Sequence, residues 1–314
     1  MAKHKPYRYV IYLLVRLAES VVYLLPRAWV LGLARLLGRA GFYLIGRQRK
    51  KTLENLKLAF GQEKSDLEIG EIAIQSFEHL TSTALEMLRF PKLRWEELAQ
   101  WVVGADEAFR VYREILRAGR GVISITAHMG NWELLAGIMA VSKTCQGAII
   151  ARRLYYERYD RWVVGLRQSL GVRTIYREDA ARMALEILAK NQVVGLLPDQ
   201  DIDSLKGVFV NYFGRPAYTP VAPVRLALAS GAPILPNFLI RQRDGKYKIV
   251  LGEVLWPRVT TTRENAVREY TEKWMLDFEK VIRQYPQQWA WMHNRWKTQS
   301  FQQVDSPRDR KSVV

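Results

Sequence analysis

A histidine and a glutamate lie five positions apart in this chain, at His128 and Glu133. The apolar run Val122–Ile125 just before them predicts a strand, and the run Trp132–Val141 predicts a helix. His128 thus follows a strand end, which is where α/β proteins with parallel sheets place reactive groups. A carboxylate that binds one imidazole nitrogen leaves the other free to accept a proton. We therefore expect His128 to act as a general base, with Glu133 orienting it.

No nucleophile that would form a covalent intermediate accompanies this pair. The chain lacks a Gly-x-Ser-x-Gly elbow, and its single cysteine, Cys145, lies beyond the predicted helix without a local base. Direct attack by a substrate hydroxyl is the simpler mechanism. The structural alternative is that His128 and Glu133 only cap the helix, because a lone His-x₄-Glu is a short motif. The other histidines, His4, His79 and His293, are expected to be structural.

Other polar residues are expected at the same edge of the sheet. Asp199 and Gln200 follow the predicted strand Val193–Leu197, and Asp199 either points a carboxylate at the same sheet edge as His128 or lies in a solvated turn. Arg152 and Arg153 follow the predicted strand Ala148–Ile150, where they either bind a phosphate or an oxyanion or only add surface charge.

Backbone donors and an acidic stretch are two further features near these strand ends. The backbone N–H groups of Gly130, Asn131 and Trp132 open the predicted helix and are expected to stabilise a tetrahedral intermediate. The acidic stretch 199–203 resembles a calcium loop, but Ser204 and Val210 replace the glycine and glutamate that such a loop requires. We expect no metal site, and without a phosphate-binding glycine loop we expect no nucleotide or other cofactor.

The order of predicted elements indicates an α/β fold. From residue 106 onward, short β-branched runs alternate with amphipathic segments, which predicts a mostly parallel sheet flanked by helices. The runs Ile234–Ile240 and Tyr247–Val254, joined by the turn 243–246, predict an antiparallel hairpin, and Arg263–Gln284 predicts a final helix. Residues 65–90 predict a helix that ends before Pro91.

The N-terminal segment differs in composition from the rest of the chain. The whole sequence carries 48 Lys and Arg against 31 Asp and Glu, a net charge of +17, and its first 51 residues contain Glu19 as their sole acid. Basic, aromatic and aliphatic residues are interleaved there, as in helices at a membrane interface. Arg16, Glu19 and Arg27 interrupt the apolar stretches, and Pro26 should end or kink the first helix, so a clean spanning helix is disfavoured. The sequence leaves both a spanning and an interfacial helix open. Core helices of a basic soluble protein are the alternative.

These patterns predict three regions: membrane-associating helices over 1–50, an α/β domain over 51–304, and a disordered tail over 305–314. The positive charge favours an acidic partner such as an anionic lipid, a phosphorylated substrate or an acidic protein. Nucleic acid is disfavoured because no zinc-finger, RNP or basic-zipper pattern is present.

Several motifs together resemble the bacterial lipid A late acyltransferases, within the glycerolipid-type His-x₄-Asp/Glu acyltransferases. They run in family order over nearly the whole chain: His128–Glu133, Leu197–Asp201, Phe213–Pro220, Ala232–Pro236 and Pro286–Trp296. The resemblance implies a glycerolipid acyltransferase-like fold, with His128 as base and Glu133 as its partner.

The resemblance also implies an activity and a location. It implies transfer of a fatty acyl chain from an acyl carrier protein thioester to a hydroxyl of a lipid A precursor, at the cytoplasmic face of the bacterial inner membrane. One alternative is an acyltransferase that uses acyl-CoA and acts on a phospholipid or glycolipid. Another is a non-catalytic adaptor at the membrane surface, in which the His–Glu pair is structural.

Overall fold

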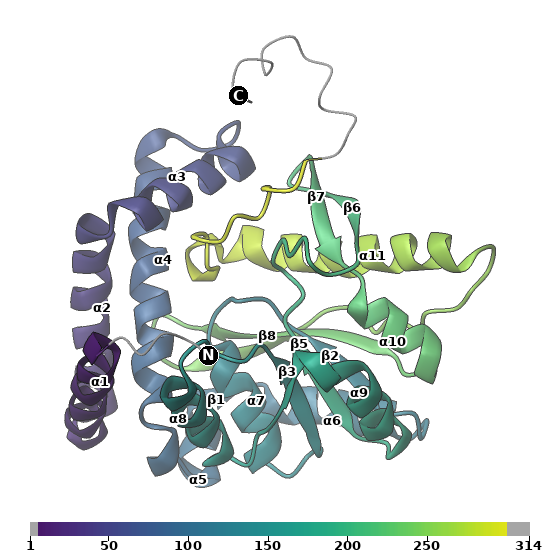
Figure 1. Ribbon diagram of the computed structural model, residues 1–314, viewed down its shortest axis with the longest axis horizontal. Coiled ribbons are helices and arrows are strands. Elements are labelled where there is room, and N and C mark those ends of the chain that lie inside the picture. The colour runs from purple at the N-terminus through teal and green to yellow at the C-terminus, as the bar shows by residue number, and fades with distance from the viewer. Residues whose placement is uncertain (1–5, 300–314) are drawn as a thin grey trace.

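A seven-stranded sheet forms the centre of the computed structural model, which describes residues 6–299 (Figure 1). The strand order is β1-β9-β8-β2-β5-β3-β4, and all neighbours are parallel except β8 and β9. The strands are β1 (Val102–Val103), β2 (Val122–Ile125), β3 (Gly147–Ala151), β4 (Arg173–Tyr176), β5 (Val193–Leu196), β8 (Ile234–Arg241) and β9 (Tyr247–Leu251). The predicted fold class, a mostly parallel sheet flanked by helices, is confirmed.

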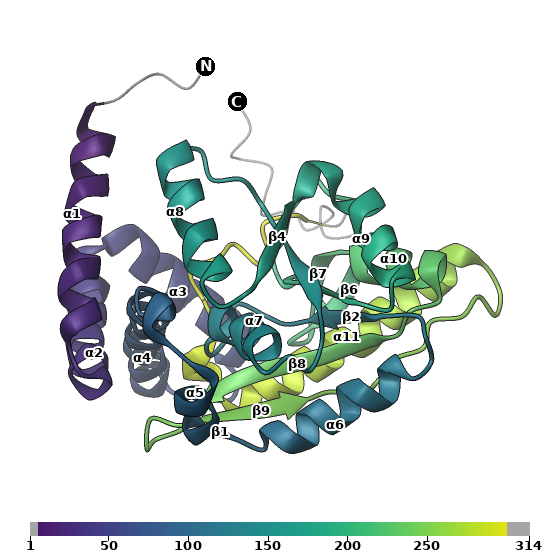
Figure 2. The ribbon, with the colours of Figure 1, turned by 90° about the horizontal axis from the view of Figure 1, so that it is seen from below.

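Helices cover both faces of this sheet and contribute to two separate apolar clusters (Figure 2). One cluster joins the sheet to α5 (Trp95–Trp101), α6 (Ala105–Leu116), α7 (Trp132–Val141) and α8 (Glu157–Gln168). The other joins it to α9 (Ala180–Ala189), α10 (Ala222–Ser230) and α11 (Arg263–Gln284). In β2 the side chains alternate between the two clusters, so that Ile123 and Ile125 face one and Val122 the other.

The first four helices stand along one side of the sheet (Figure 1): α1 (Pro6–Leu24), α2 (Arg27–Leu44), α3 (Gly46–Phe60) and α4 (Asp66–Met87). Pro26 separates α1 from α2, as expected from its missing N–H. A capping box begins α4, because the Ser65 hydroxyl accepts from the Glu68 N–H and the Glu68 carboxylate accepts from the Ser65 N–H. This helix ends at Met87, and the 3₁₀ turn Phe90–Lys92 follows it.

Two features were absent from the sequence-based prediction. The strands β6 (Gly207–Tyr212) and β7 (Arg215–Pro220) form a separate antiparallel hairpin that packs near α11, and β1 adds a short edge strand to the sheet. Phe213 and Gly214 connect β6 to β7, and both have positive φ. Pro216 and Pro220 obscure the strand signal in β7, because proline is depleted in strands.

The N-terminal helices leave many large apolar side chains in contact with solvent. On α1 and α2 they include Leu13, Leu14, Leu17, Leu24, Trp29, Leu36 and Leu44. Among residues 6–299, no single helix has the length and apolarity to cross a membrane; α2 and α3 meet that criterion jointly, but they meet at 92°. The predicted domain boundaries remain predictions, and the tail 305–314, like Lys3, His4 and Lys5, lies outside the described residues.

Candidate active site

His128 lies just beyond β2 and is held by a carboxylate from the neighbouring strand. Its Nδ1 is 2.7 Å from Oδ1 of Asp199, which follows β5. The other oxygen of Asp199 accepts from the His128 backbone N–H at 2.8 Å and from the Trp289 indole N–H at 2.9 Å. Asp199 is 1% exposed, whereas part of the His128 ring is accessible. The solvated-turn alternative for Asp199 is thus excluded.

The electrostatics of this pair keep Asp199 ionised. Burial opposes ionisation, but the charge of His128 and the hydrogen bonds from His128 and Trp289 more than offset it and hold the pKa of Asp199 well below its ordinary value. A carboxylate at Nδ1 fixes the proton on that nitrogen, which leaves the lone pair of the neutral ring on Nε2. The geometry therefore provides a base with its accepting atom defined.

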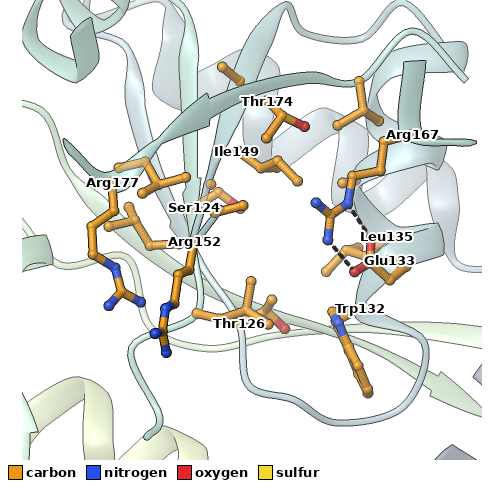
Figure 3. Close-up of a pocket in the computed structure, with 18 of the residues that line it drawn as sticks. Ser124, Thr126, Trp132, Glu133, Leu135, Ile149, Arg152, Arg167, Thr174 and Arg177 are labelled. Atoms are coloured by element: carbon orange, nitrogen blue, oxygen red, sulfur yellow. Dashed lines mark hydrogen bonds and ion pairs between the residues drawn. The ribbon is translucent and has the colours of Figure 1, made fainter. Parts of the chain in front are cut away.

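The predicted contact between His128 and Glu133 is wrong. Glu133 is the second residue of α7, and its carboxylate accepts two hydrogen bonds, at 2.8 and 2.6 Å, from the guanidinium of Arg167 on α8 (Figure 3). The sequence distance of five residues suggested that the side chain would fold back, but the helix directs it across to α8. Asp199 orients His128 instead, while Glu133 ties α7 to α8 beside the same cavity.

The loop between His128 and α7 also differs from its predicted role. The N–H of Gly130 donates to Gln288 O at 3.0 Å, and the N–H of Asn131 donates to Leu239 O at 2.9 Å. The Asn131 side chain caps α7 by accepting from the Leu134 N–H. The expectation that Gly130 and Asn131 supply oxyanion donors is therefore wrong. Trp132 lines the cavity, and its backbone N–H makes no hydrogen bond to the described residues.

Gly130 is needed for the shape of this loop. Its φ is +59°, and a Cβ added there would lie 2.0 Å from Leu239 O. The backbone of β8 therefore packs directly against the loop. The segment after α11 holds the other side, because the Ala290 N–H donates to His128 O and Met129 bridges to Trp289.

Gln200 and His293 lie next to the His128 ring. The Gln200 amide nitrogen is 3.2 Å from Nε2 of His128 and 3.0 Å from Nε2 of His293, so it can donate to both imidazoles. The rings of His128 and His293 have centroids 5.2 Å apart. Burial and the charge of His128 lower the pKa of His293 to about 4, so this second ring is neutral near pH 7. Gln200 reaches the cavity, as expected of a substrate-binding residue.

A cavity of about 800 Å³ extends from His128 beneath α7 and α8. It follows the sheet from the carboxyl ends of β2, β3 and β5 toward the other ends of the strands, where Cys145 and Gly147 line it. Its walls combine apolar side chains such as Leu135, Met139 and Ile149 with a comparable share of polar and charged ones. Its length and its position beside the base suit an extended apolar chain.

Two arginines, Arg152 and Arg177, line the side of the cavity opposite Glu133 and Arg167 (Figure 3). Arg152 is at the cavity wall as expected, and it is accompanied by Arg177, which the sequence analysis did not select. Arg153 instead stacks over the Tyr176 ring, with its guanidinium carbon 3.9 Å from the ring centroid. The role predicted for Arg153 is therefore not supported by its orientation.

Strand order is the information that sequence reasoning lacked here. β2 and β5 are neighbours, with Ile125 opposite Leu196, and His128 and Asp199 each lie three residues further on. Arg167, Trp289 and Thr126 were also not selected. Thr126 lines the cavity, and its buried hydroxyl lacks a hydrogen-bond partner among the described residues.

Comparison with known proteins identifies the family. The model of the bacterial lipid A biosynthesis acyltransferase family matches residues 2–298. The chain belongs to this family. The match includes the β2–α7 loop, the strand ends that carry Asp199 and Arg152, and the segment after α11.

The relatives include lipid A biosynthesis acyltransferases and phosphatidylinositol mannoside acyltransferases. A lipid A biosynthesis lauroyltransferase of Escherichia coli is 27% identical over 303 residues, 92% of this chain and 89% of the relative. A palmitoleoyltransferase of the same pathway and organism is 24% identical over 262 residues, 80% of this chain and 79% of the relative. A phosphatidylinositol mannoside acyltransferase of Mycobacterium tuberculosis is 27% identical over 215 residues, and that alignment spans 67% of this chain and 66% of the relative.

Proposed function

We propose that this chain transfers a fatty acyl chain from an acyl carrier protein thioester to a hydroxyl group of a lipid A precursor. The observation that carries the proposal is His128, held by Asp199 with Nε2 as the accepting atom, at one end of a long cavity. Membership of the family supports the same reaction class. A 3-hydroxyacyl chain on the acceptor is one source of the attacking hydroxyl.

The reaction proceeds by direct attack. Nε2 of His128 takes the proton from the acceptor hydroxyl as its oxygen forms a bond to the thioester carbonyl carbon. Ionised Asp199 stabilises the imidazolium that results. The tetrahedral intermediate then collapses, the C–S bond breaks, and the leaving sulfur takes the proton from Nε2. The products are the ester and the free thiol, so the base returns to its starting state.

Of the three backbone oxyanion donors suggested by the sequence, only the Trp132 N–H is retained in our proposal. Since the N–H groups of Gly130 and Asn131 are engaged, we assign this role to the Trp132 N–H and the Thr126 hydroxyl. Both residues line the cavity beside His128. A buried hydroxyl without a partner costs free energy that a hydrogen bond to the developing oxyanion would recover.

Glu133 and Arg167 are proposed to act as positioning residues. Their two hydrogen bonds join α7 to α8 at the cavity wall, so they hold the Trp132 N–H in place without contacting His128. This role differs from the orientation of the base that the sequence suggested for Glu133. Arg167→Lys preserves the charge but loses the fork of two parallel hydrogen bonds. We therefore expect it to lower kcat more than it changes KM. An unchanged kcat would contradict the positioning role.

The proposed donor is acyl carrier protein rather than coenzyme A. The net charge of +17 favours an acidic protein partner. The alternative is an acyl-CoA donor with a phospholipid or glycolipid acceptor, and its acceptor is supported by the mycobacterial relatives, which are named as phosphatidylinositol mannoside acyltransferases. Competition between the same acyl chain on carrier protein and on coenzyme A, at equal concentration, separates the two: preferential consumption of acyl-CoA would overturn the donor assignment.

We also propose that α1 and α2 associate with the cytoplasmic face of the bacterial inner membrane. Exposed Leu13, Leu17, Trp29 and Leu36 would enter the lipid while neighbouring arginines contact anionic headgroups. Co-sedimentation with vesicles containing anionic lipid tests this proposal. Wild-type protein should bind, and a Trp29→Ser/Leu36→Ser variant should bind less. Equal recovery of the two proteins in the vesicle pellet would contradict membrane association through α1 and α2.

The central experiment compares wild-type protein with His128→Ala in a transfer assay. Its components are acyl carrier protein bearing a labelled chain and a purified lipid A precursor. We expect His128→Ala to lower the rate about 10²–10⁴-fold, the usual contribution of a general base. Circular dichroism and thermal unfolding of the variant provide the folding control. Undiminished transfer by a folded variant would support the non-catalytic adaptor instead.

A further inference from the structure

Two arginines lie side by side at the carboxyl ends of neighbouring strands. β3 and β4 are parallel, and Ala151 at the end of β3 is paired with Tyr176 at the end of β4. Arg152 and Arg177 are the next residues on the two strands, so they occupy matching positions across the ladder. Both line the cavity, and Figure 3 shows their side chains extending in the same direction, away from Glu133 and Arg167.

This pair has no bound carboxylate partner among the described residues. Within residues 6–299, neither Arg152 nor Arg177 forms an ion pair or hydrogen bond with another side chain, although most other cavity-facing charges do. Burial and the charge of Arg152 lower the pKa of Arg177, and the exposed Glu178 offsets this only in part. Two adjacent guanidinium groups repel each other, and an anion placed between them removes that repulsion.

The neighbouring arginine is engaged differently. Arg153 stacks over the Tyr176 ring, and the Tyr176 hydroxyl donates to Asp160. Alternation along the chain turns Arg153 away from the side that Arg152 occupies. Arg153 is also absent from the cavity lining, so it provides a matched control of equal charge at the next position.

The separation from His128 decides which anion this pair can bind. In the strand order β2-β5-β3-β4, β3 is two strands and β4 three strands away from β2. At a spacing of about 4.8 Å per strand, the backbones of Arg152 and Arg177 lie about 10 and 14 Å along the sheet edge from that of His128. The thioester carbonyl must lie beside His128, so an anion between the arginines belongs to a more distant part of a substrate.

We propose that Arg152 and Arg177 together form a binding site for a phosphate ester carried by one of the two substrates. The proposal rests on the function proposed above and adds a subsite to it. A guanidinium pair offers parallel N–H donors that match phosphate oxygens, which favours phosphate over a single carbonyl oxygen. Two sources have this chemistry: the phosphate that links the thiol-bearing arm of the donor to its carrier, and a phosphate on the glycolipid acceptor.

The first experiment compares Arg152→Gln, Arg177→Gln and the control Arg153→Gln in the transfer assay. We expect each of the first two variants to raise KM for the phosphate-bearing substrate about 10- to 100-fold, as for the loss of a charge-assisted contact, with a smaller change in kcat. Arg153→Gln should stay within twofold of wild type. Arg152→Lys and Arg177→Lys should recover part of the affinity, because they restore charge but not the fork.

Two further comparisons identify the source of the phosphate. With an acyl-pantetheine donor that lacks the phosphate, the penalty of Arg177→Gln should disappear if the donor carries the ligand. With an enzymatically dephosphorylated acceptor, it should disappear if the acceptor carries the ligand. A penalty that survives both replacements, or one that equals that of Arg153→Gln, would overturn the proposal.

Binding of inorganic phosphate gives a readout that does not depend on acyl transfer. Phosphate should raise the melting temperature of wild-type protein and of Arg153→Gln more than that of the Arg152→Gln/Arg177→Gln double variant. If the proposed acyl transfer is wrong, the difference in phosphate-induced melting-temperature shift should still be seen. Equal shifts in all three proteins would contradict the phosphate site without bearing on the acyl transfer.

Discussion

Asp199 has more influence on His128 than any neighbour in the chain sequence. It binds both the ring and the backbone N–H of His128, and Trp289 binds the same carboxylate. Three contacts on one buried group restrict both the tautomer and the rotation of the imidazole. Glu133, which the motif suggested for this task, is engaged by Arg167 instead.

Asp199→Asn should lower kcat by about 10²-fold or more. An amide at this position no longer stabilises the imidazolium, and it can donate to Nδ1 and move the ring proton to Nε2. Steady-state rates at saturating donor and acceptor measure the effect. Glu133→Gln is the informative comparison, because it keeps a hydrogen bond to Arg167 and should cost less; the reverse order would restore Glu133 as the partner of the base.

Thr126→Val should reduce kcat about 10- to 10³-fold while leaving KM for the donor nearly unchanged. Valine has nearly the same shape but cannot donate to the oxyanion, whose charge exists only in the transition state. Thr126→Ser keeps the hydroxyl and should retain most of the activity. Thr174→Val is the matched control, because Thr174 on the more distant β4 also lines the cavity and its hydroxyl also lacks a hydrogen-bond partner among the described residues. Equal losses in Thr126→Val and Thr174→Val would argue against an oxyanion contact.

At the scale of elements, α4 is linked to the β2–α7 loop through a buried polar network. The Thr83 hydroxyl donates to Gly130 O at 2.8 Å, and the Asn131 amide donates to Glu86 at 3.0 Å. Glu86 also accepts from the guanidinium of Arg241 on β8, from Arg27 at the start of α2 and from the Tyr247 hydroxyl on β9. The N-terminal helices therefore share one anchor with the loop that carries His128.

Glu86→Ala should destabilise the protein by about 3–5 kcal/mol. Its removal leaves Arg241 and Arg27 without their buried counter-charge, which costs more than the ion pair itself contributes. Urea unfolding followed by fluorescence measures the loss. Glu71→Ala, at an exposed position of the same helix, should change stability by less than about 0.5 kcal/mol. A small effect at Glu86 would show that the network tolerates unpaired arginines.

At the scale of the whole molecule, buried histidines couple stability to pH. His79 accepts from Arg241, and burial together with the charges of Arg241 and Arg35 lowers its pKa to about 3. His293 has a pKa of about 4 for similar reasons. Below the ordinary histidine pKa of about 6.5, the unfolded chain therefore binds protons that the folded chain does not.

The free energy of unfolding should consequently fall as the pH decreases from about 6.5 toward 5. Each of the two histidines contributes up to about 1.4 kcal/mol per pH unit in this window. Urea titrations at several pH values measure the slope. His79→Gln should reduce it by about half, and an unchanged slope would contradict the assignment. Glu86 and Asp199, whose pKa values are lowered, add their own losses only below about pH 4.5.

The local patterns of the sequence were sufficient for most individual elements. Strand β2 and helices α7 and α11 have the predicted bounds, since apolar periodicity and short turns are encoded locally. His128 and Arg152 were identifiable as candidate site residues because each follows a predicted strand. The unusual composition of the first 51 residues also belongs to the sequence itself.

The partners of these residues depended on the tertiary structure. The insertion of β5 between β2 and β3 brings Asp199 beside His128, and the pairing of β3 with β4 brings Arg177 beside Arg152. Strand order is set by packing among elements far apart in the chain, which no spacing within a motif encodes. For the same reason Glu133, five residues from His128, binds an arginine 34 residues away, while the base takes a carboxylate from 71 residues away.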